Sequence, residues 1–163
     1  MAKDRGSNKV EDAVQQSTSS TARPISEMNL VFAEACWLMS RSKAHGHVTM
    51  GDMDWLVLPP IILKQARIFR DGKQDPIAFM SWALVSDEVN HRLKSGVQKL
   101  EPVDWNSGQH FWIIDLVTPF GEALPILEIV YTLLPADRPH PVLPFGGKDL
   151  TSLVGRNRNA PIN

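Results

Sequence analysis

Two side chains far apart in the sequence, His45 and Asp115, could form the polar centre of a catalytic site. Asp115 stands in the middle of the apolar run Phe111-Trp-Ile-Ile-Asp-Leu-Val117, which is typical of a buried strand. A carboxylate is costly to bury unless a cation or a hydrogen-bond donor pairs with it. We therefore expect Asp115 either to hold a cation or orient an imidazole, or to cap a turn at the end of the strand.

His45 ends the segment Ser42-Lys-Ala-His45, which follows a predicted helix and precedes Gly46 and His47. Histidine is the usual general base near neutral pH. A histidine that is oriented by a buried carboxylate makes up half of a catalytic triad in any fold. Histidines in a loop of Ser, Lys and Gly are usually solvated, so the pattern alone leaves both interpretations open.

Composition narrows the class of protein. The chain has 163 residues, a net charge of −1 and one cysteine, which suits a single domain with a substantial core. The balanced charge does not favour nucleic acid as a partner. The sequence has no apolar run of membrane-span length, no secretory signal at its start and no Cys/His cluster of zinc spacing. The lone Cys36 excludes an internal disulfide and indicates a reducing, cytoplasmic compartment.

The elements that must position these residues follow from local signals. Residues 1–25 predict a disordered tail, residues 26–150 a single domain and residues 151–163 a loosely ordered tail. Ser26 is predicted to cap a helix that ends near Ser40, with its buried face formed by Leu30, Ala33, Trp37 and Leu38. Cys36, on the same helix, is expected to be a small buried hydrophobe away from the loop chemistry rather than a nucleophile.

The remaining elements alternate between helices and strands. We expect a short helix beginning around Pro59 and Pro60, a hairpin over 67–70 and 76–85, a helix over 87–94, the Asp115 strand, and a helix from Gly121 to Leu134 that Pro135 ends. This order predicts an α+β fold with helices packed on a small mixed sheet. Gly146-Gly-Lys148 lacks the preceding strand and the following helix of a phosphate loop.

Four segments together resemble the RTX toxin-activating lysine acyltransferases, which activate protoxins such as alpha-haemolysin. These segments are Trp37-Leu-Met-Ser40 with Ser42-Lys-Ala-His45, then Leu58-Pro-Pro-Ile61, then Pro76-Ile-Ala-Phe-Met-Ser-Trp-Ala83, then Trp112-Ile-Ile-Asp-Leu-Val-Thr-Pro-Phe-Gly121. They occur in the order of the family, at close to its spacings, over residues 30–150. The combination is specific, although no single segment would suffice.

The resemblance implies an activity and a site. Family members transfer a fatty acyl group from acyl carrier protein to internal lysines of an RTX protoxin, and their fold is similar to that of the GNAT acetyltransferases. Their essential histidine falls on His45, their essential aspartate on Asp115, and a serine that matters in some members on Ser42. The implied partners are the acyl carrier protein, as donor substrate, and the protoxin; no cofactor is expected, and a homodimer is a possible assembly.

One departure from the family lies beside the histidine. Many members read Ser-Pro-Leu-His-Arg where this chain has Ser42-Lys-Ala-His45-Gly46. The loop loses a stiff proline and gains a flexible glycine. His47 thereby becomes a nearby rival for the role of base.

The implied reaction assigns further residues. A lysine has a reference pKa of about 10.4, so His45 is expected to take a proton from the amine while Asp115 orients the imidazole. Backbone N–H groups near Ser81 and Trp82 are expected to hold the thioester arm and the oxyanion. The basic residues Lys64, Arg67, Arg92, Lys94 and Lys99 are candidates for docking the acidic carrier, with Arg92 and Lys94 preferred. Apolar residues of the hairpin and of the Asp115 strand are expected to line an acyl groove.

Two other functions stay open from the sequence. One is a GNAT-type acetyltransferase that uses acyl-CoA, although the pyrophosphate loop Gln/Arg-x-x-Gly-x-Gly of those enzymes is not found. The other is a non-catalytic toxin chaperone or export adaptor. The presence of both His45 and Asp115 in the pattern of the family argues against the adaptor.

Overall fold

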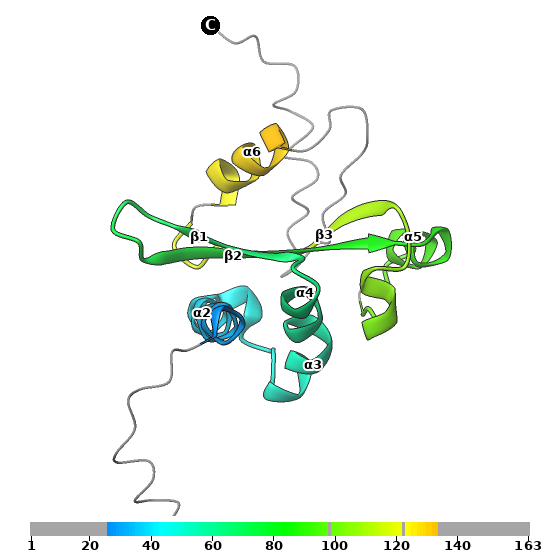
Figure 1. The fold of residues 1–163 in the computed structure, drawn as a ribbon, viewed down its shortest axis with the longest axis horizontal. Coiled ribbons are helices and arrows are strands. Elements are labelled where there is room, and N and C mark those ends of the chain that lie inside the picture. The colour runs from blue at the N-terminus through cyan, green and yellow to red at the C-terminus, as the bar shows by residue number, and fades with distance from the viewer. Residues whose placement is uncertain (1–25, 98, 122, 134–163) are drawn as a thin grey trace, which may run out of the picture.

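The computed structural model describes residues 26–97, 99–121 and 123–133 (Figure 1). The elements are α2 (Glu27–Arg41), η1 (Lys43–His45), η2 (Met50–Asp52), α3 (Met53–Leu56), α4 (Leu58–Ile62), β1 (Ala66–Arg70), β2 (Pro76–Val85), α5 (Asp87–Lys94), η3 (Pro102–Trp105), β3 (His110–Val117) and α6 (Ala123–Leu133). Helices and a three-stranded sheet confirm the predicted α+β class. The predictions for residues 1–25, for Pro135 and for residues 151–163 lie outside the described residues.

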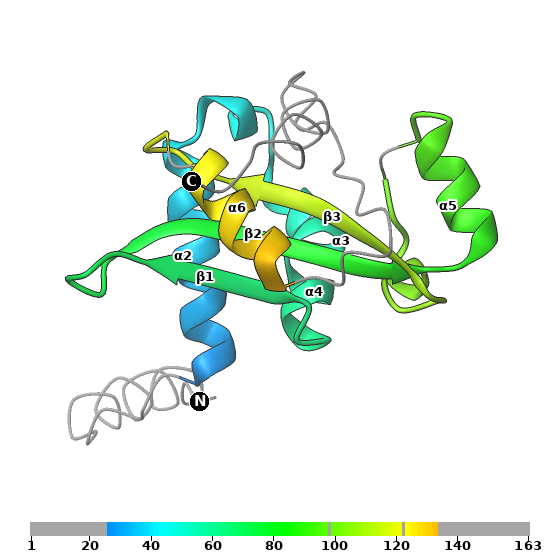
Figure 2. The ribbon, with the colours of Figure 1, turned by 90° about the horizontal axis from the view of Figure 1, so that it is seen from above.

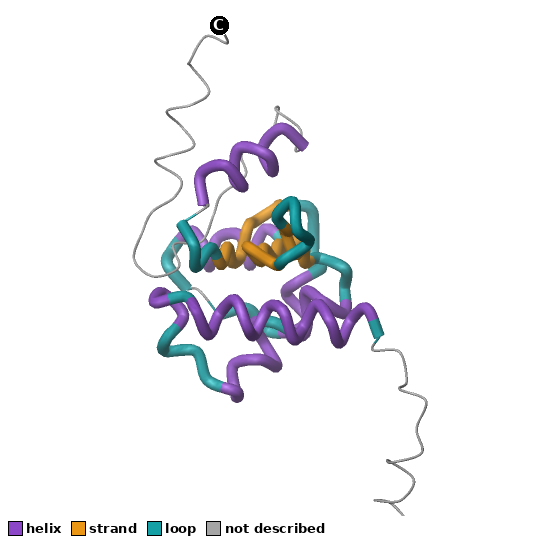
Figure 3. The backbone as a smooth tube through the Cα atoms, turned by 90° about the vertical axis from the view of Figure 1, so that its left-hand side faces the viewer, coloured by secondary structure: helices purple, strands orange, loops and turns teal. Residues whose placement is uncertain are grey.

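The helices and the sheet form three layers (Figures 1 and 3). Helices α2, α3 and α4 cover one face of the sheet, and α6 crosses the other face, as Figure 2 shows from above. Helix α5 lies at one end of the sheet. The core is therefore divided by the sheet, with Phe79 of β2 packing toward α2 and Met80, its neighbour, packing toward α6.

Helix α2 begins where the sequence predicts. The Asn29 N–H donates to Ser26 Oγ at 3.2 Å, so Ser26 is the N-cap. The predicted buried face is wrong, because Leu30 and Trp37 are 43% and 41% exposed.

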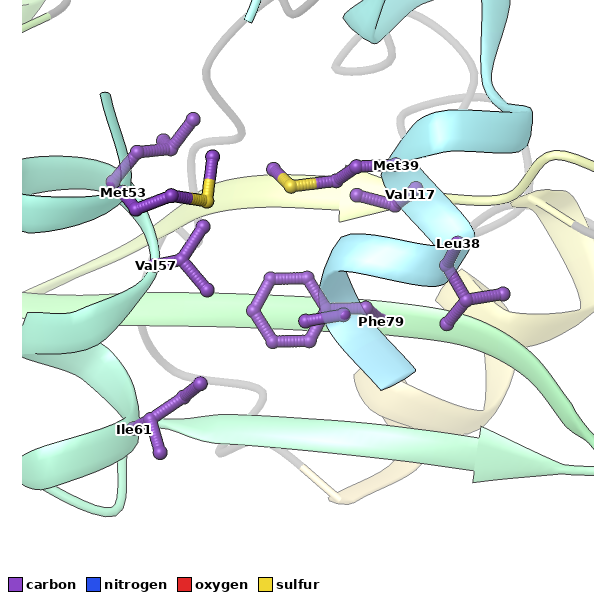
Figure 4. Close-up of a cluster of buried hydrophobic side chains, with 9 residues drawn as sticks. Leu38, Met39, Met53, Val57, Ile61, Phe79 and Val117 are labelled. Atoms are coloured by element: carbon purple, nitrogen blue, oxygen red, sulfur yellow. The ribbon is translucent and has the colours of Figure 1, made fainter. Parts of the chain in front are cut away.

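The face of α2 that contacts the sheet is displaced from the predicted one. Its buried side chains are Ala35, Leu38 and Met39, which follow the spacing of a helical stripe. Leu38 and Met39 pack with Phe79 and Val117 of the sheet (Figure 4). Of the four residues predicted to be buried, Leu38 alone lies on this face.

The predicted hairpin is confirmed. Strands β1 and β2 pair antiparallel, and the Asp71 side chain accepts from the backbone N–H groups of Lys73 at 2.8 Å and Asp75 at 2.9 Å. The Asp71 carboxylate thus accepts from two backbone N–H groups that a tight turn leaves without a backbone partner.

The prediction of a mixed sheet is wrong for the described part of the chain, where all three strands run antiparallel in the order β1-β2-β3. The reason lies in the connection between β2 and β3. Val85, the last residue of β2, is paired with His110, the first residue of β3, so α5 and η3 return the chain to the same end of the sheet. The parallel contact between Leu84 and Asn106 is an isolated bridge.

A β-bulge interrupts the pairing of β2 with β3. Ser81 lies opposite Asp115 and Trp82 lies opposite Ile113, so Ile114 is an extra residue on β3. Ile113 belongs to the cluster under α6, whereas Ile114 belongs to a cluster on the opposite face. The bulge therefore turns Asp115 toward the α2 side of the sheet.

Candidate functional site

His45 is placed by a short 3-10 turn that follows α2. The Ser42 N–H donates to the Met39 carbonyl at 3.0 Å and ends the helix, and the His45 N–H donates to the Ser42 carbonyl at 3.1 Å. The turn folds the imidazole inward, so that His45 is only 4% exposed. The expectation of a solvated loop histidine does not hold for His45.

Ser42, His45 and Asp115 form a chain of hydrogen bonds. His45 Nε2 lies 3.0 Å from Asp115 Oδ1, and His45 Nδ1 lies 2.7 Å from Ser42 Oγ. An ionised carboxylate can only accept, so Nε2 carries the hydrogen that bonds Asp115. Nδ1 of the neutral ring then accepts from the Ser42 hydroxyl. The three predicted site residues are thus brought together in the order of a serine–histidine–aspartate triad.

Burial makes Asp115 effective as a partner for the imidazole. Its side chain is fully buried, and so is that of Ser81, which lies opposite it on β2. Asp115 Oδ2 and Ser81 Oγ have no hydrogen-bond partner among the described residues. The Asp115 carboxylate is therefore directed at His45 through Oδ1 and fixes the orientation of the imidazole.

His47 stands apart from this chain. It is exposed, and Asp115 is bonded to His45 rather than to it. Gly46 has a φ of −61°, which any residue can adopt, so the backbone at this position does not require glycine. Gly46 takes no part in the hydrogen bonds that join Ser42, His45 and Asp115.

A pocket of about 340 Å³ lies beside His45. Its walls come from α2 and from the segment that follows the 3-10 turn; they include Cys36, Met39, His45, Val48, Met50 and Met53. Cys36 is half-buried and lines this pocket, which corrects the prediction that it lies away from the loop chemistry. Burial raises the pKa of the Cys36 thiol, so it is a poor nucleophile at neutral pH.

The predicted oxyanion donors are not supported. The Trp82 N–H donates to the carbonyl of Gln65 at 3.0 Å, because the residue just before β1 continues the contact between the strands. The Ser81 side chain is fully buried in the sheet. Trp82 therefore has no backbone donor to offer to a thioester.

The two preferred docking cations, Arg92 and Lys94, are not brought to His45. Arg92 forms an ion pair with Asp104, which ties α5 to η3. Helix α5, which also carries Lys94, lies where β3 begins. Asp115 is five residues further along β3 than His110, which is roughly 16 Å at the usual rise per residue. Arg92 and Lys94 would have to contact a carrier at a distance from the base.

The predicted acyl groove along the strands is also not supported. The apolar residues of β2 and β3 nearest the site, such as Phe79, Val117 and Ile114, are buried in the core. Sequence reasoning missed the methionines that line the pocket instead. Their signal was available, because Met39, Met50 and Met53 flank the histidine within a short stretch.

Two further properties concern only the described part of the chain. Within it, no three His, Cys, Asp or Glu side chains are grouped so that they could hold a metal ion. None of the helices in that part has the length and apolar character needed to cross a membrane.

Comparison with known proteins finds a matching family and several similar proteins. The sequence model of the RTX toxin acyltransferase family matches residues 25–137, which include the whole hydrogen-bond chain. A lysine-acyltransferase of Vibrio cholerae is 35% identical over 105 residues, covering 63% of this chain and 64% of the relative.

Two other relatives give similar matches. A protein-lysine myristoyltransferase of Kingella kingae is 34% identical over 88 residues, covering 53% of this chain and 52% of the relative. An RTX-II toxin-activating lysine-acyltransferase of Actinobacillus pleuropneumoniae is 30% identical over 107 residues, covering 66% of each. The chain thus spans about half to two thirds of the length of the curated relatives it matches.

Proposed function

The chain belongs to the RTX toxin acyltransferase family, and we propose that it transfers a fatty acyl group from acyl carrier protein to the ε-amino group of internal lysines of an RTX protoxin. The observation that carries this proposal is the buried chain from Ser42 through His45 to Asp115. It supplies a base for the proton that the amine nitrogen must lose as it attacks a thioester.

The printed names of the relatives support the reaction class. They describe a lysine-acyltransferase, a protein-lysine myristoyltransferase and a toxin-activating lysine-acyltransferase. We extend lysine acylation from those proteins to this chain, and from the resemblance described above we propose a GNAT-like arrangement of its helices and sheet. The lone Cys36 fits a reducing cytoplasm as the compartment in which the acyl carrier donor would be met.

The hydrogen-bond directions suggest a route for the proton. The lone pair of His45 Nδ1 faces the Ser42 hydroxyl, so the attacking amine would give its proton to Ser42 Oγ as Ser42 passes its own proton to Nδ1. Asp115 would stabilise the imidazolium that results. General-base assistance of this kind is typically worth about 10²–10⁴-fold in rate.

The transfer balances for a lysine that arrives as the neutral amine, its ammonium proton having been released to solvent. The lysine nitrogen forms a bond to the thioester carbon, and the bond from that carbon to sulfur breaks. The leaving thiolate takes the proton held by the imidazolium and departs as the thiol. Ser42, His45 and Asp115 return to their starting protonation states.

The experiment that tests the proposal is the intact mass of a candidate protoxin co-expressed with this protein. We expect a mass gain of one or more fatty acyl groups on lysine, absent when His45 is replaced by Gln. The purified reaction with acyl carrier donor should slow as salt rises, because an acidic carrier docks through charge.

The same experiment separates the other two functions. An acetyltransferase would use acyl-CoA as well as the carrier donor and would show no salt dependence. An adaptor would bind the protoxin and leave its mass unchanged. Either result would overturn the proposal.

A further inference from the structure

We propose that the pocket beside His45 holds the hydrocarbon end of the acyl donor. This inference rests on the proposed function. It identifies the part of the substrate that the pocket would select, which is a straight apolar chain. The pocket measures about 340 Å³, at the lower end of the range typical of ligand sites, roughly 300–1,000 Å³. It would therefore limit the length of chain that fits.

The depth of the pocket is apolar and adaptable. Met39 and Met53 are 4% and 7% exposed, and Figure 4 shows their side chains extending toward one another from α2 and α3. Met50 is 79% exposed and lies at the mouth. Methionine is unbranched and flexible, so such a lining fits an alkyl chain without fixing its position by hydrogen bonds.

The polar side chains around the pocket have partners within the protein. Ser40 Oγ donates to the Trp37 carbonyl at 2.7 Å, and Thr49 Oγ1 donates to Asp52 at 2.8 Å. The Cys36 thiol contacts the Met53 sulfur at 3.7 Å. The pocket thus offers an apolar surface rather than hydrogen-bonding groups, and no carboxylate is among its lining residues to receive the ammonium of the acceptor lysine.

The position of the pocket favours the acyl donor as its occupant. His45 is part of its wall, so a chain seated between α2 and α3 would leave its carbonyl group near the base. Each methylene that enters the pocket is expected to strengthen binding by roughly fourfold. The chain-length preference of the enzyme would then be set by how far Val48 and Cys36 allow the chain to enter.

The first test fills the pocket. Val48→Phe and Cys36→Leu are expected to lower kcat/KM for hexadecanoyl donor at least tenfold relative to octanoyl donor, with a dodecanoyl donor between them. Val97→Phe makes the same change at a residue that is exposed on the loop after α5, and its chain preference should equal that of the unaltered protein. An unchanged preference in folded Val48→Phe and Cys36→Leu would overturn the assignment of the pocket.

The second test does not depend on acyl transfer. Cys36 is the one cysteine of the chain, so its alkylation by iodoacetamide, in which the thiolate sulfur displaces iodide, can be followed by intact mass. N-methyldecanamide is expected to slow this alkylation several-fold, whereas N-methylacetamide at the same concentration should not. Protection without any acyl transfer would contradict the proposed function and keep the pocket assignment; acyl transfer without protection would contradict the pocket alone.

Discussion

Ile114 and Asp115 are consecutive residues of β3, yet both side chains point to the same face of the sheet. In a regular strand, neighbours point to opposite faces, so one residue of this pair would lie under α6. The bulge at Ile114 removes that restriction. It allows Ile114 to fill the core beside Trp112 while Asp115 reaches His45.

Replacement of His45 by Gln should lower the rate of acyl transfer roughly 10²–10⁴-fold, because the amide can donate to Asp115 but cannot take a proton. His47→Gln is the matched control and should keep most of the activity, since His47 is exposed and Asp115 bonds His45. Single-turnover rates with acyl carrier donor measure the difference. An inactive His47→Gln variant together with an active His45→Gln variant would show that His47, and not His45, is the base.

Asp115→Asn should reduce kcat by about 10²–10⁴-fold while donor binding changes little, because the amide keeps the shape but loses the charge that favours the imidazolium. The melting temperature should stay the same or rise, since a buried neutral amide is less costly than a buried carboxylate. Kinetics and thermal melts on the same preparation separate the two effects. A collapse of the melting transition would mean that Asp115 serves the fold rather than the reaction.

Ser42→Ala should slow acyl transfer by roughly 10²-fold, because the proton relay to His45 Nδ1 loses its hydroxyl. Ser42→Thr keeps a hydroxyl and should restore part of the rate. Ser95→Ala is the matched control, since the Ser95 hydroxyl donates to the Arg92 carbonyl at the end of α5, away from the pocket. An acyl group found on Ser42 by peptide mapping after incubation with donor would replace the relay by an acyl-serine intermediate.

Asp52 should make the stability of the folded protein depend on pH. Its pKa is lowered from 3.8 to about 2, first by the N–H of Thr49 and then by the indole of Trp55. A lowered pKa in the folded state means that the contribution to stability is present above pH 3.8 and is lost as the pH falls toward 2. Asp52→Asn should therefore melt at a lower temperature than the unaltered protein at neutral pH, and the two should converge near pH 2. A difference that does not change with pH would contradict this linkage.

Gly108→Ala should destabilise the fold by about 1–3 kcal/mol, because a Cβ at this position would lie 2.6 Å from both Ser86 Cα and the Val85 carbonyl oxygen. These are backbone atoms and cannot turn aside. Gly72→Ala is the control, because a Cβ there meets nothing within 4 Å. Urea unfolding midpoints compare the two variants; equal midpoints would show that the backbone at Gly108 shifts freely.

Elements with strong local signals could be predicted from the sequence. The hairpin follows from Asp71-Gly72, and α5 follows from Ser86, whose side chain accepts from the Val89 N–H at 3.3 Å. The face of α2 could not be predicted in the same way. Trp37 is large and apolar but packs on Phe120 at the surface, with ring centroids 5.9 Å apart, because the sheet contacts the next stripe of the helix.

The site was only partly predictable for a related reason. Asp115 is marked in the sequence by its place inside an apolar strand, and the resemblance to the family links it to Ser42 and His45, which share a motif. The bulge, the occupied Trp82 amide and the pocket between Met39 and Met53 depend on which segments meet in space. The catalytic roles of the three residues stay a prediction until the variants above are measured.

The bonds of His45 differ greatly in sequence separation, with Ser42 three residues away and Asp115 70 residues away. The first contact needs only the end of α2, whereas the second needs β3 to be paired with β2. Contacts between distant segments carry the larger entropic cost of loop closure and govern slow folding. During refolding, helical signal should therefore return before the base has its carboxylate. Recovery of acyl transfer during refolding would then report when β3 has paired with β2.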